Sequence, residues 1–533
     1  MQNKHSKENP TIQAEKSKHK PTEQTADMPV EKTSRIPTEE TSHMPAEKTS
    51  HVPAVKNSSI LTEQASVMQP KENSENKTNN AASPVPEIPV MIQQASIYQT
   101  FSRESLSEHF QQFPEKPIEI HGTVHRIREM NGFSFLILRT GRELIQCVVD
   151  NGISSQERVI EGSSIRVTGY VNIDEKSHSG PEIRVSSLVV LSSPAKDLPF
   201  VLGKKKLDIS LDTNLDNRSV ALRHPEERAV FRIQEGITQS FREYFTQQSF
   251  VEIHTPKIVF SGAEGGANIF KLNYFGKEVY LAQSPQFYKQ AMVGVFERVF
   301  EVGAVYRAEK HNTSRHLNEY IGLDVEMGFI DSYEDLLRYE TGWLLYMVQH
   351  LSDHYKKELE LLKATVPVLS GGIPSISFHE AKQIAKKKLK HSVAEDRDDL
   401  SPDEETVICK EIFNLTGSEF VFVTHYPTSK RPFYAMEDPK NTEVTLSFDL
   451  LFRGLEVTTG GQRIHDYQEQ VKKMVHRGMD PAVFESYLQI HQSGMPPHGG
   501  FGAGLERLTM KMLNLPNIRQ ASLYPRDMNR VIP

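Results

Sequence analysis

The chain has no aromatic residue before Tyr98, and this limits compact folding to the rest of its 533 residues. An eight-residue polar repeat in the first part is marked by Pro21, Pro29, Pro37, Pro45 and Pro53. A segment of this composition cannot bury enough apolar surface to offset the entropy lost on ordering. We therefore expect residues 1–100 to form a disordered tail, and a drifting repeat explains it more simply than a binding tether does.

The composition of the whole chain describes a mildly acidic protein with room for two or three domains. Its net charge is -7, so any nucleic-acid binding must use a local basic face. Cys147 and Cys409 are the only cysteines, which indicates neither a disulfide framework nor a zinc site. Neither an apolar run of membrane length nor a secretory signal is visible. We expect a cytoplasmic protein with no membrane partner.

Residues 101–195 read as a short amphipathic helix followed by a small all-β barrel of the OB type. Five alternating segments are expected as strands: Ile118 to Arg126, Phe133 to Leu138, Leu144 to Val149, Ser164 to Val171 and Ile183 to Leu191. Phe133 and Phe135 share one face, where they could stack bases or fill the core, and we expect the core for one of them. A phosphate-facing surface is suggested by Arg126, Arg128, Arg139 and Arg142.

Residues 196–217 are expected to be a polar linker, and residues 218–533 a large α+β unit. In this unit an amphipathic helix, Glu226 to Gln247, leads into a strand that ends at Pro256. A second strand, Phe300 to Glu309, is followed by a polar loop and then by a further strand. Such a hairpin presents four charged side chains at one end: Arg307, Glu309, Arg315 and His316.

A third segment combines glycines with a cation, from Gly499 to Arg507. Glycines let the backbone approach a base or ribose closely, and Arg507 in the helix that follows could lie over an adenine ring. The stretch from Leu446 to Val457 is expected to be one closing strand. Between Leu362 and Lys430, a Lys-rich helix and an acidic run are expected to pack on the sheet as an elaboration.

Three segments resemble, in this order, the signature motifs of class II aminoacyl-tRNA synthetases. They are the helix and strand that end at Pro256, the hairpin that begins at Phe300, and the glycine run that ends at Arg507. With the barrel in front and a short distance from His316 to Glu456, the resemblance narrows to aspartyl-tRNA synthetases of the archaeal and eukaryotic type. It covers the chain from about Ile118 onwards. The resemblance implies an antiparallel six-stranded sheet flanked by helices and a homodimer. It also implies Mg²⁺ as a cofactor and ATP, L-aspartate and tRNA-Asp as substrates.

The resemblance also implies which residues bind the amino acid. Glu264 matches a mobile loop that closes over aspartate, while Lys289 and Arg463 match the cations that hold its side-chain carboxylate. Related asparagine and lysine enzymes usually carry an apolar residue at the position of Lys289. Asp324 and Glu326 add negative charge near the ammonium group. The full set of expected aspartate contacts is Glu264, Gln286, Lys289, Arg307, Asp324, Thr459 and Arg463.

For ATP, the resemblance makes Arg307 and Arg507 the catalytic residues. Arg307 would touch both the carboxylate and the α-phosphate, and Arg507 would cap the adenine. Mg²⁺ would be held by Glu456 and by Thr459, where the family usually has serine. The remaining expected ATP contacts are Glu309 at the adenine amino group, Arg315 and His316 at the distal phosphates, and Leu317 and Gly504. No side chain is an obvious nucleophile, which suits catalysis by positioning.

On the barrel, the expected anticodon contacts are Arg128, Phe135 and Gln146. The spacing between Arg128 and Phe135 departs by one residue from the family pattern. Strict archaeal enzymes have tryptophan where this chain has Thr123, and relaxed enzymes often carry proline near the position of Pro181. These two residues favour relaxed specificity, in which tRNA-Asn is charged as well as tRNA-Asp.

Three other functions fit parts of the sequence. An asparaginyl-tRNA synthetase would share the fold and the motifs, but Lys289 argues against it. A non-catalytic paralogue acting as a binding module would have lost the site charges, which this chain retains. An amidoligase that forms aspartyl-adenylate would not need the barrel.

Overall fold

The computed structural model describes residues 102–141, 143–153, 157–173, 180–260, 268–310, 312–369, 372–389 and 398–532. The expected tail, residues 1–100, lies outside the described residues, as do Arg142 and Glu264. Among the helices that the structure describes, none combines the length and the apolar character needed to cross a membrane.

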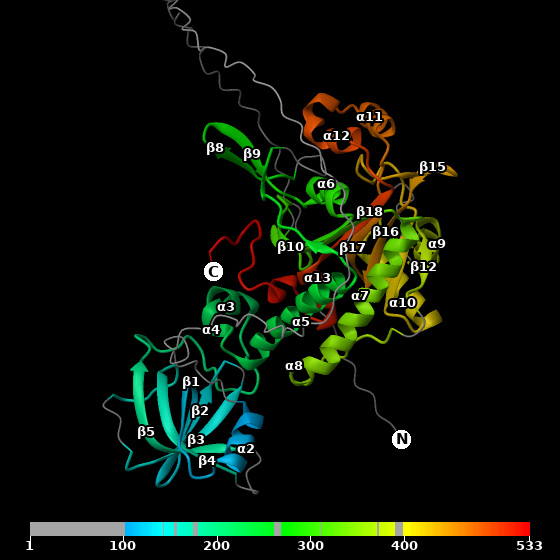
Figure 1. Ribbon diagram of the computed structural model, residues 1–533. Coiled ribbons are helices and arrows are strands. Elements are labelled where there is room, and N and C mark those ends of the chain that lie inside the picture. Colours follow the sequence, from blue (N-terminus) through cyan, green and yellow to red (C-terminus); the bar gives the residue numbers. More distant parts are fainter. Residues whose placement is uncertain are drawn as a thin grey trace, which may run out of the picture. The chain divides into compact units, whose positions relative to one another are not determined.

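The first described region is a closed five-stranded barrel with one helix packed on it (Figure 1). The strands follow the order β1-β2-β3-β5-β4, and β4 pairs with β1 to close the barrel. The expected OB-type barrel is therefore confirmed. Its elements are α2 (Arg103–Gln112), β1 (Ile118–Glu129), β2 (Phe133–Arg139), β3 (Leu144–Asp150), β4 (Ser164–Asn172) and β5 (Glu182–Ser192).

The two phenylalanines of β2 both lie outside the barrel core, so the expectation that one of them fills it is wrong. Successive residues of a strand point to opposite faces. In β2 the inward positions are taken by Leu136 and Leu138, which are buried in the barrel core. Phe133 and Phe135 therefore share the opposite face, where their rings meet edge to face at 5.1 Å.

The expected linker is partly helical. Within residues 196–217 the chain forms α3 (Leu211–Asp216), which begins where the Ser210 hydroxyl accepts a hydrogen bond from the Thr213 backbone N–H. The short helix α4 (Arg218–Ala221) follows directly. A linker that is polar in composition can thus still contain a capped helix.

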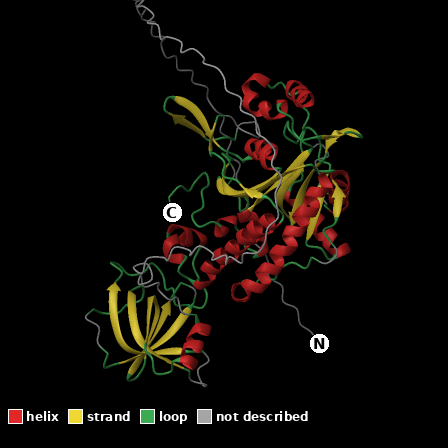
Figure 2. Cartoon of the chain, in the orientation of Figure 1, coloured by secondary structure: helices red, strands yellow, loops and turns green. Residues whose placement is uncertain are grey.

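The larger region is built on an eight-stranded sheet in the order β12-β13-β16-β17-β18-β11-β10-β6. Figure 2 shows its strands in yellow with red helices beside them. Its six central strands are antiparallel to one another, which confirms the expected sheet, and a short parallel strand is added at each edge. The strands are β6 (Val251–Glu252), β10 (Arg298–Tyr306), β11 (Glu319–Gly328), β12 (Ser375–Ser377), β13 (Phe420–Thr424), β16 (Ser447–Phe452), β17 (Leu455–Gln462) and β18 (His498–Gly504).

Two long helices, α5 (Pro225–Gln247) and α7 (Tyr333–His354), lie side by side and pack with the sheet in one hydrophobic core (Figure 1). Phe241 of α5 meets Trp343 of α7 edge to face at 5.0 Å, and both side chains are fully buried. The other helices are α6 (Gln286–Phe296), α8 (Lys356–Leu362), α9 (Phe378–Lys388), α10 (Pro402–Thr416), α11 (Tyr467–His476), η1 (Pro481–Phe484), α12 (Glu485–Gln492), α13 (Leu505–Met512) and η2 (Ile518–Ala521).

Two small sheets complete the described elements. Three strands pair in the order β7-β9-β8: β7 (Ile258–Val259), β8 (Lys271–Tyr274) and β9 (Lys277–Leu281). The other two, β14 (Glu437–Asp438) and β15 (Asn441–Thr445), pair with each other.

The expected single strand from Leu446 to Val457 is instead two strands, β16 and β17. Arg453 and Gly454 form the turn between them, with φ values of 47° and 78°. Two consecutive residues with positive φ are typical of a tight hairpin turn whose twist matches the flanking strands. This reversal places Glu456 and Thr459 on β17, the strand next to β18 in the middle of the sheet.

Candidate active site

A cavity of about 540 Å³ is lined by residues from β10, β11, β17 and β18 and from helices α6 and α13. It brings together every site residue expected in the larger region, except Glu264, which lies outside the described residues. These residues are Gln286, Lys289, Arg307, Glu309, Arg315, His316, Leu317, Asp324, Glu456, Thr459, Arg463, Gly504 and Arg507. Side chains far apart in sequence therefore share one concave site.

The glycine run is a strand inside the sheet, and two of its glycines make room for carboxylates. Gly500 and Gly502 lie opposite Glu326 and Asp324 of β11. A Cβ atom on Gly500 would be 2.2 Å from Glu326 Oε2, and one on Gly502 would be 3.0 Å from Asp324 Oδ1. Gly502 and Gly504 also line the cavity, and the expectation that the glycine run lets a nucleotide approach the backbone stays a prediction.

Lys289 and Arg463 lie at one end of the cavity and share a carboxylate partner. Lys289 Nζ is 3.0 Å from Asp324 Oδ1 and 3.3 Å from Glu326 Oε2. Arg463 Nε donates to Glu326 Oε1 at 2.9 Å. Two cations and two carboxylates therefore balance within the protein, and of the two carboxylates only that of Asp324 lines the cavity.

The pKa values of these two carboxyl groups shift in opposite directions. Burial favours the neutral acid in both cases. In Asp324 burial outweighs the effect of Lys289, and its pKa is raised above the ordinary value. In Glu326 burial is outweighed by Arg463 and Lys289, and its pKa is lowered. Glu326 therefore stays charged and fixes both cations.

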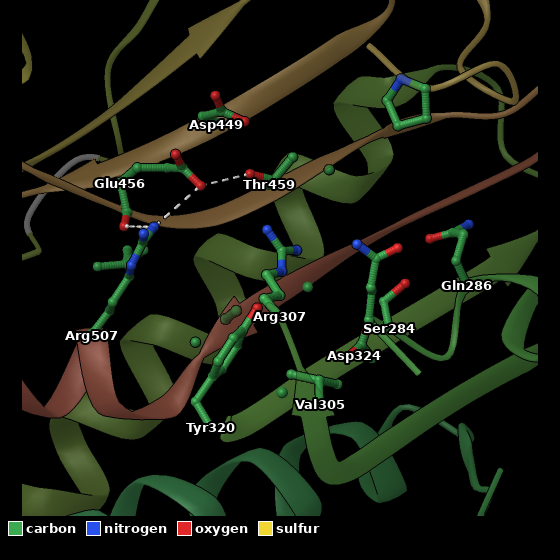
Figure 3. Close-up of a pocket in the computed structure, with 18 of the residues that line it drawn as sticks. Ser284, Gln286, Val305, Arg307, Tyr320, Asp324, Asp449, Glu456, Thr459 and Arg507 are labelled. Carbon is green, nitrogen blue, oxygen red and sulfur yellow. Dashed lines mark hydrogen bonds and ion pairs between the residues drawn. The ribbon is translucent and has the colours of Figure 1, made fainter. Parts of the chain in front are cut away.

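Two polar side chains near these cations have a buried atom without a hydrogen-bond partner among the described residues. They are Gln286, through Nε2, and Ser284, through Oγ. Both line the cavity, and Figure 3 shows them beside Asp324. Because buried polar atoms in folded proteins are nearly always paired, these two indicate a polar ligand. Ser284 was not predicted from the sequence, although it lies only two residues before Gln286.

The other end of the cavity holds the charged residues of the β10–β11 hairpin, which is present as expected. Arg307 Nη1 is 4.0 Å from Glu309 Oε1, and His316 Nε2 is 3.9 Å from Glu309 Oε2. The guanidinium of Arg307 also lies 5.9 Å from the ring centre of Tyr320. The Asn318 side chain donates to the backbone oxygens of Arg307 at 2.6 Å and of Glu309 at 3.0 Å. Asn318 thus anchors the chain where it leaves β10.

Glu456 and Thr459 face the cavity from β17, opposite Arg507 of α13 (Figure 3). Thr459 Oγ1 donates to Glu456 Oε1 at 2.9 Å, and Arg507 Nη1 is 3.5 Å from the same oxygen. Burial opposes ionisation of Glu456, but Arg507, the Thr459 hydrogen bond and more distant cations together lower its pKa. Its carboxylate is therefore charged at neutral pH.

The oxygen donors of Glu456 and Thr459 fit Mg²⁺. This ion binds proteins through one or two carboxylates and completes its shell with water and substrate phosphates. Within the described residues, no three His, Cys, Asp or Glu side chains are grouped as a metal site of their own. A Mg²⁺ ion at Glu456 would also need oxygen ligands from a bound phosphate and from water, as at other nucleotide sites.

Two further charged side chains near this end were missed in the sequence. Arg431 is buried, lies 4.0 Å from the ring centre of Tyr426 and donates to Asp449 Oδ1 at 2.8 Å. Glu405 of α10 contacts Arg315 and accepts from the backbone N–H of Glu456 at 3.3 Å. Burial raises the pKa of Glu405 to about 7, and Arg315 acts against this rise. Neither residue belongs to a recognisable motif, so their sequence positions carried no signal.

The three expected anticodon contacts share the outer face of the barrel. Arg128 pairs across the strands with Phe135, and Gln146 pairs with Ile137, two residues further along β2. Arg128 is exposed and the ring of Phe135 is half-buried. The amide nitrogen of Gln146 donates to Glu182 Oε2 at 3.0 Å. An aromatic ring, a cation and an amide are thus close neighbours on one surface.

Comparisons with known proteins agree with this arrangement. The family "tRNA synthetases class II (D, K and N)" matches residues 210–528, and "OB-fold nucleic acid binding domain" matches residues 118–191. The Aspartate--tRNA(Asp/Asn) ligase of Deinococcus radiodurans is 44% identical over 81% of this chain and 99% of its own length. The Aspartate--tRNA(Asp) ligase of Pyrococcus abyssi is 37% identical over 80% of this chain and 98% of its own.

A solved structure gives the same result for the fold. The asparaginyl-tRNA synthetase of Pyrococcus horikoshii complexed with asparaginyl-adenylate superposes with a TM-score of 0.73 at 31% identity, over 79% of this chain and 97% of that one. The barrel and the sheet thus have the fold of this solved enzyme. The chain belongs to the class II tRNA synthetases and, within them, to the aspartate–tRNA ligase family.

Proposed function

We propose that the protein attaches L-aspartate to tRNA-Asp at the expense of ATP, through an aspartyl-adenylate. The observation that carries this proposal is the pairing of Lys289 and Arg463 at one end of the same cavity that holds Arg307 and Arg507 at the other. Both cations line the cavity, where a ligand carboxylate can reach them in addition to their carboxylate partners in the protein. A second group of cations in the same cavity suits phosphates.

At the amino-acid end, the ligand side-chain carboxylate would lie against Lys289 and Arg463, and the ammonium group against Asp324. The unpartnered polar atoms of Ser284 and Gln286 would be satisfied by the same ligand. Glu264 would close over the ammonium group from its loop, and Thr459 would border the ligand from β17.

At the nucleotide end, the aspartate α-carboxylate oxygen attacks the α-phosphorus of ATP, and pyrophosphate leaves with the electron pair of the broken P–O bond. Arg307 would hold both the carboxylate and the α-phosphate, which places the two anions in line for reaction. The remaining contacts are those that the resemblance implies for residues lining the cavity: Glu309 to the adenine amino group, Arg315 and His316 to the distal phosphates, Arg507 over the adenine, and Leu317 and Gly504 along the nucleotide.

Glu456 and Thr459 would hold Mg²⁺ through their oxygen atoms. When bound, the ion neutralises negative charge on the phosphates and on departing pyrophosphate. Arg507 contributes by keeping Glu456 ionised, since its guanidinium lies 3.5 Å from the carboxylate. The terminal ribose hydroxyl of tRNA then attacks the carbonyl carbon of the adenylate and loses its proton, which forms the aspartyl ester while AMP leaves with the electron pair of the broken C–O bond.

ATP–pyrophosphate exchange tests this proposal directly. The purified protein should exchange label in the presence of aspartate and show little exchange with asparagine. Asparagine is the relevant competitor because solved asparaginyl enzymes share the fold. Exchange driven by asparagine alone would replace the proposed substrate, and no exchange with either amino acid would contradict an adenylate-forming enzyme.

We propose that the barrel, residues 101–195, reads the anticodon, and that residues 196–217 connect it to the catalytic region, residues 218–533. Phe135 offers a ring for a base to stack on, while Arg128 and Gln146 supply polar contacts beside it. Single-stranded bases are commonly recognised by aromatic stacking with polar contacts to their edges. The outer face of β1, β2 and β3 combines these features.

Replacing Phe135 by alanine should lower the rate of aspartylation at limiting tRNA by roughly ten- to a hundredfold, because stacking on an aromatic ring contributes ~1–3 kcal/mol. Aspartate-dependent exchange should be unchanged, since it needs no tRNA. Tyr170→Ala, an exposed aromatic on β4, is the matched control and should charge normally. A fall in both reactions would show that Phe135 supports the fold instead.

Charging of two tRNA transcripts tests specificity. We expect measurable aspartylation of both tRNA-Asp and tRNA-Asn, because Thr123 and Pro181 match the relaxed pattern. The relatives at 44–45% identity are Aspartate--tRNA(Asp/Asn) ligases, whereas the Pyrococcus abyssi Aspartate--tRNA(Asp) ligase is 37% identical. Each purified transcript is charged with labelled aspartate. Complete rejection of tRNA-Asn would establish strict specificity and leave the enzyme class unchanged.

We also propose that the protein is a homodimer and that it works in the cytoplasm. The first of these is supported by apolar side chains that are exposed along one stretch of the chain: Val251, Ile258, Phe260, Leu272, Tyr274 and Phe275. Phe275, at the tip of the β8–β9 hairpin, is 91% exposed. Exposed apolar side chains that lie together on a surface are common at protein interfaces. Cys147 and Cys409 are free thiols, which accords with a reducing compartment.

A further inference from the structure

We propose that Glu405 of α10 is a positioning residue for ATP, which it serves by holding Arg315 in place. This inference rests on the proposed function, in which Arg315 meets the distal phosphates. Glu405 lies outside the three signature segments, in the elaboration between β11 and β16. It does not line the cavity, and its effect on ATP would pass through Arg315.

The Glu405 carboxylate makes two contacts with the nucleotide end through one oxygen. Oε2 forms an ion pair with Arg315 Nη2 and accepts the backbone N–H of Glu456 at 3.3 Å. Its side chain is 9% exposed, against 20% for Arg315. One buried oxygen thus connects the loop after β10 with the start of β17, the two segments that carry the proposed phosphate and Mg²⁺ contacts.

Helix α10 presents this carboxylate from a firmly packed position. The helix starts at Pro402 with a capping box between Ser401 and Glu404, and Glu404 also pairs with Lys382 of α9 at 2.8 Å. Its inner face packs against strands β13, β16 and β17. A carboxylate fixed on a packed helix holds its partner more exactly than one on a free loop.

The contact with Glu405 restricts Arg315 before ATP binds. Arginine has many rotamers, and ordering such a side chain on binding costs conformational entropy. A guanidinium has five N–H donors, so the pair with Glu405 leaves donors for a phosphate. Removing the Glu405 charge should therefore weaken ATP binding while leaving the chemical step and aspartate binding nearly unchanged.

Steady-state exchange kinetics of Glu405→Gln test this inference at pH 8, where a carboxyl group with a pKa of about 7 is mostly ionised. The amide keeps the shape of the side chain and an acceptor for the Glu456 N–H, but loses the charge that holds Arg315. We expect the KM for ATP to rise about three- to tenfold, with kcat and the KM for aspartate changed less than about twofold. Glu411→Gln is the matched control on the same helix, because Glu411 pairs with Lys388 at 2.8 Å and does not line the cavity.

A double mutant establishes whether the effect passes through Arg315. In an Arg315→Gln background, Glu405→Gln should cause no further rise in the KM for ATP, since coupled residues are non-additive. An equal rise in both backgrounds, or an unchanged or lower KM in the single mutant, would overturn the inference. If Glu405→Gln lowers thermal stability, Glu405→Asp is measured in both backgrounds instead. Its side chain is one methylene shorter, so the carboxylate lies further from Arg315. Absence of exchange in the unmutated protein would instead refute the proposed function.

Discussion

Replacing Lys289 by leucine should reduce aspartate-dependent ATP–pyrophosphate exchange by at least about a hundredfold, because breaking a buried ion pair costs about 3–5 kcal/mol. In the proposed complex Lys289 faces the carboxylate of aspartate, and leucine leaves that charge with one cation instead of two. The effect should appear mainly in kcat/KM for aspartate. Arg463→Met should act in the same direction, since Arg463 also contacts Glu326 at 2.9 Å.

The same substitution should also lower thermal stability, because Asp324 and Glu326 lose a cation at 3.0 and 3.3 Å. Lys382→Met separates the two effects. Lys382 pairs with the buried Glu404 at 2.8 Å, outside the cavity, so its loss should lower the melting temperature but leave the KM for aspartate unchanged. Wild-type exchange in Lys289→Leu would contradict the assignment of the amino-acid pocket.

The barrel strands could be predicted because their core is made by simple alternation. Ile118, Ile120 and Val124 of β1 face inward at mostly even spacing, and the polar residues between them face out. The same rule could have placed the phenylalanines of β2 correctly. Leu136 and Leu138 lie on the inner face of β2, so Phe133 and Phe135 lie on its outer face.

The central strands of the catalytic sheet were harder to delimit. All six residues of β16 are buried, so no alternation marks its two faces, and a fully buried strand reads as one continuous apolar run. The turn at Arg453 and Gly454 is only two residues long and contains one glycine. The single strand expected from the sequence therefore included this turn.

The site residues that could be predicted were those carried by motifs, and they do share one cavity. The pairing among them could not be predicted, because it depends on neighbouring strands. Glu326 reaches Lys289 and Arg463 only where glycine stands opposite it in β18. Glu405 reaches Arg315 only through the packing of α10 on the sheet. Sequence patterns report on one element at a time, and these contacts join elements that are distant in sequence.

Replacing Glu456 by glutamine should reduce exchange by about a hundredfold or more at fixed Mg²⁺, which is the scale of losing a charged group that stabilises a phosphoryl transition state. The amide has the same shape and can still accept the hydrogen bond from Thr459. It lacks the negative charge that Mg²⁺ needs and that now pairs with Arg507 at 3.5 Å. The fold should persist, because the side chain is 36% exposed.

Two measurements separate a lost metal ligand from a damaged site. Raising Mg²⁺ should recover part of the exchange in Glu456→Gln, because a weakened site fills at higher concentration. Mg²⁺ added with ATP should stabilise the unmutated protein against heat and stabilise the variant less, since a ligand that binds only the folded state raises stability. Glu419→Gln is the matched control, because Glu419 pairs with Arg453 at 2.7 Å outside the cavity. If Glu456→Gln exchanges normally and binds Mg²⁺ and ATP as before, Glu456 has a structural role and the metal ligand lies elsewhere.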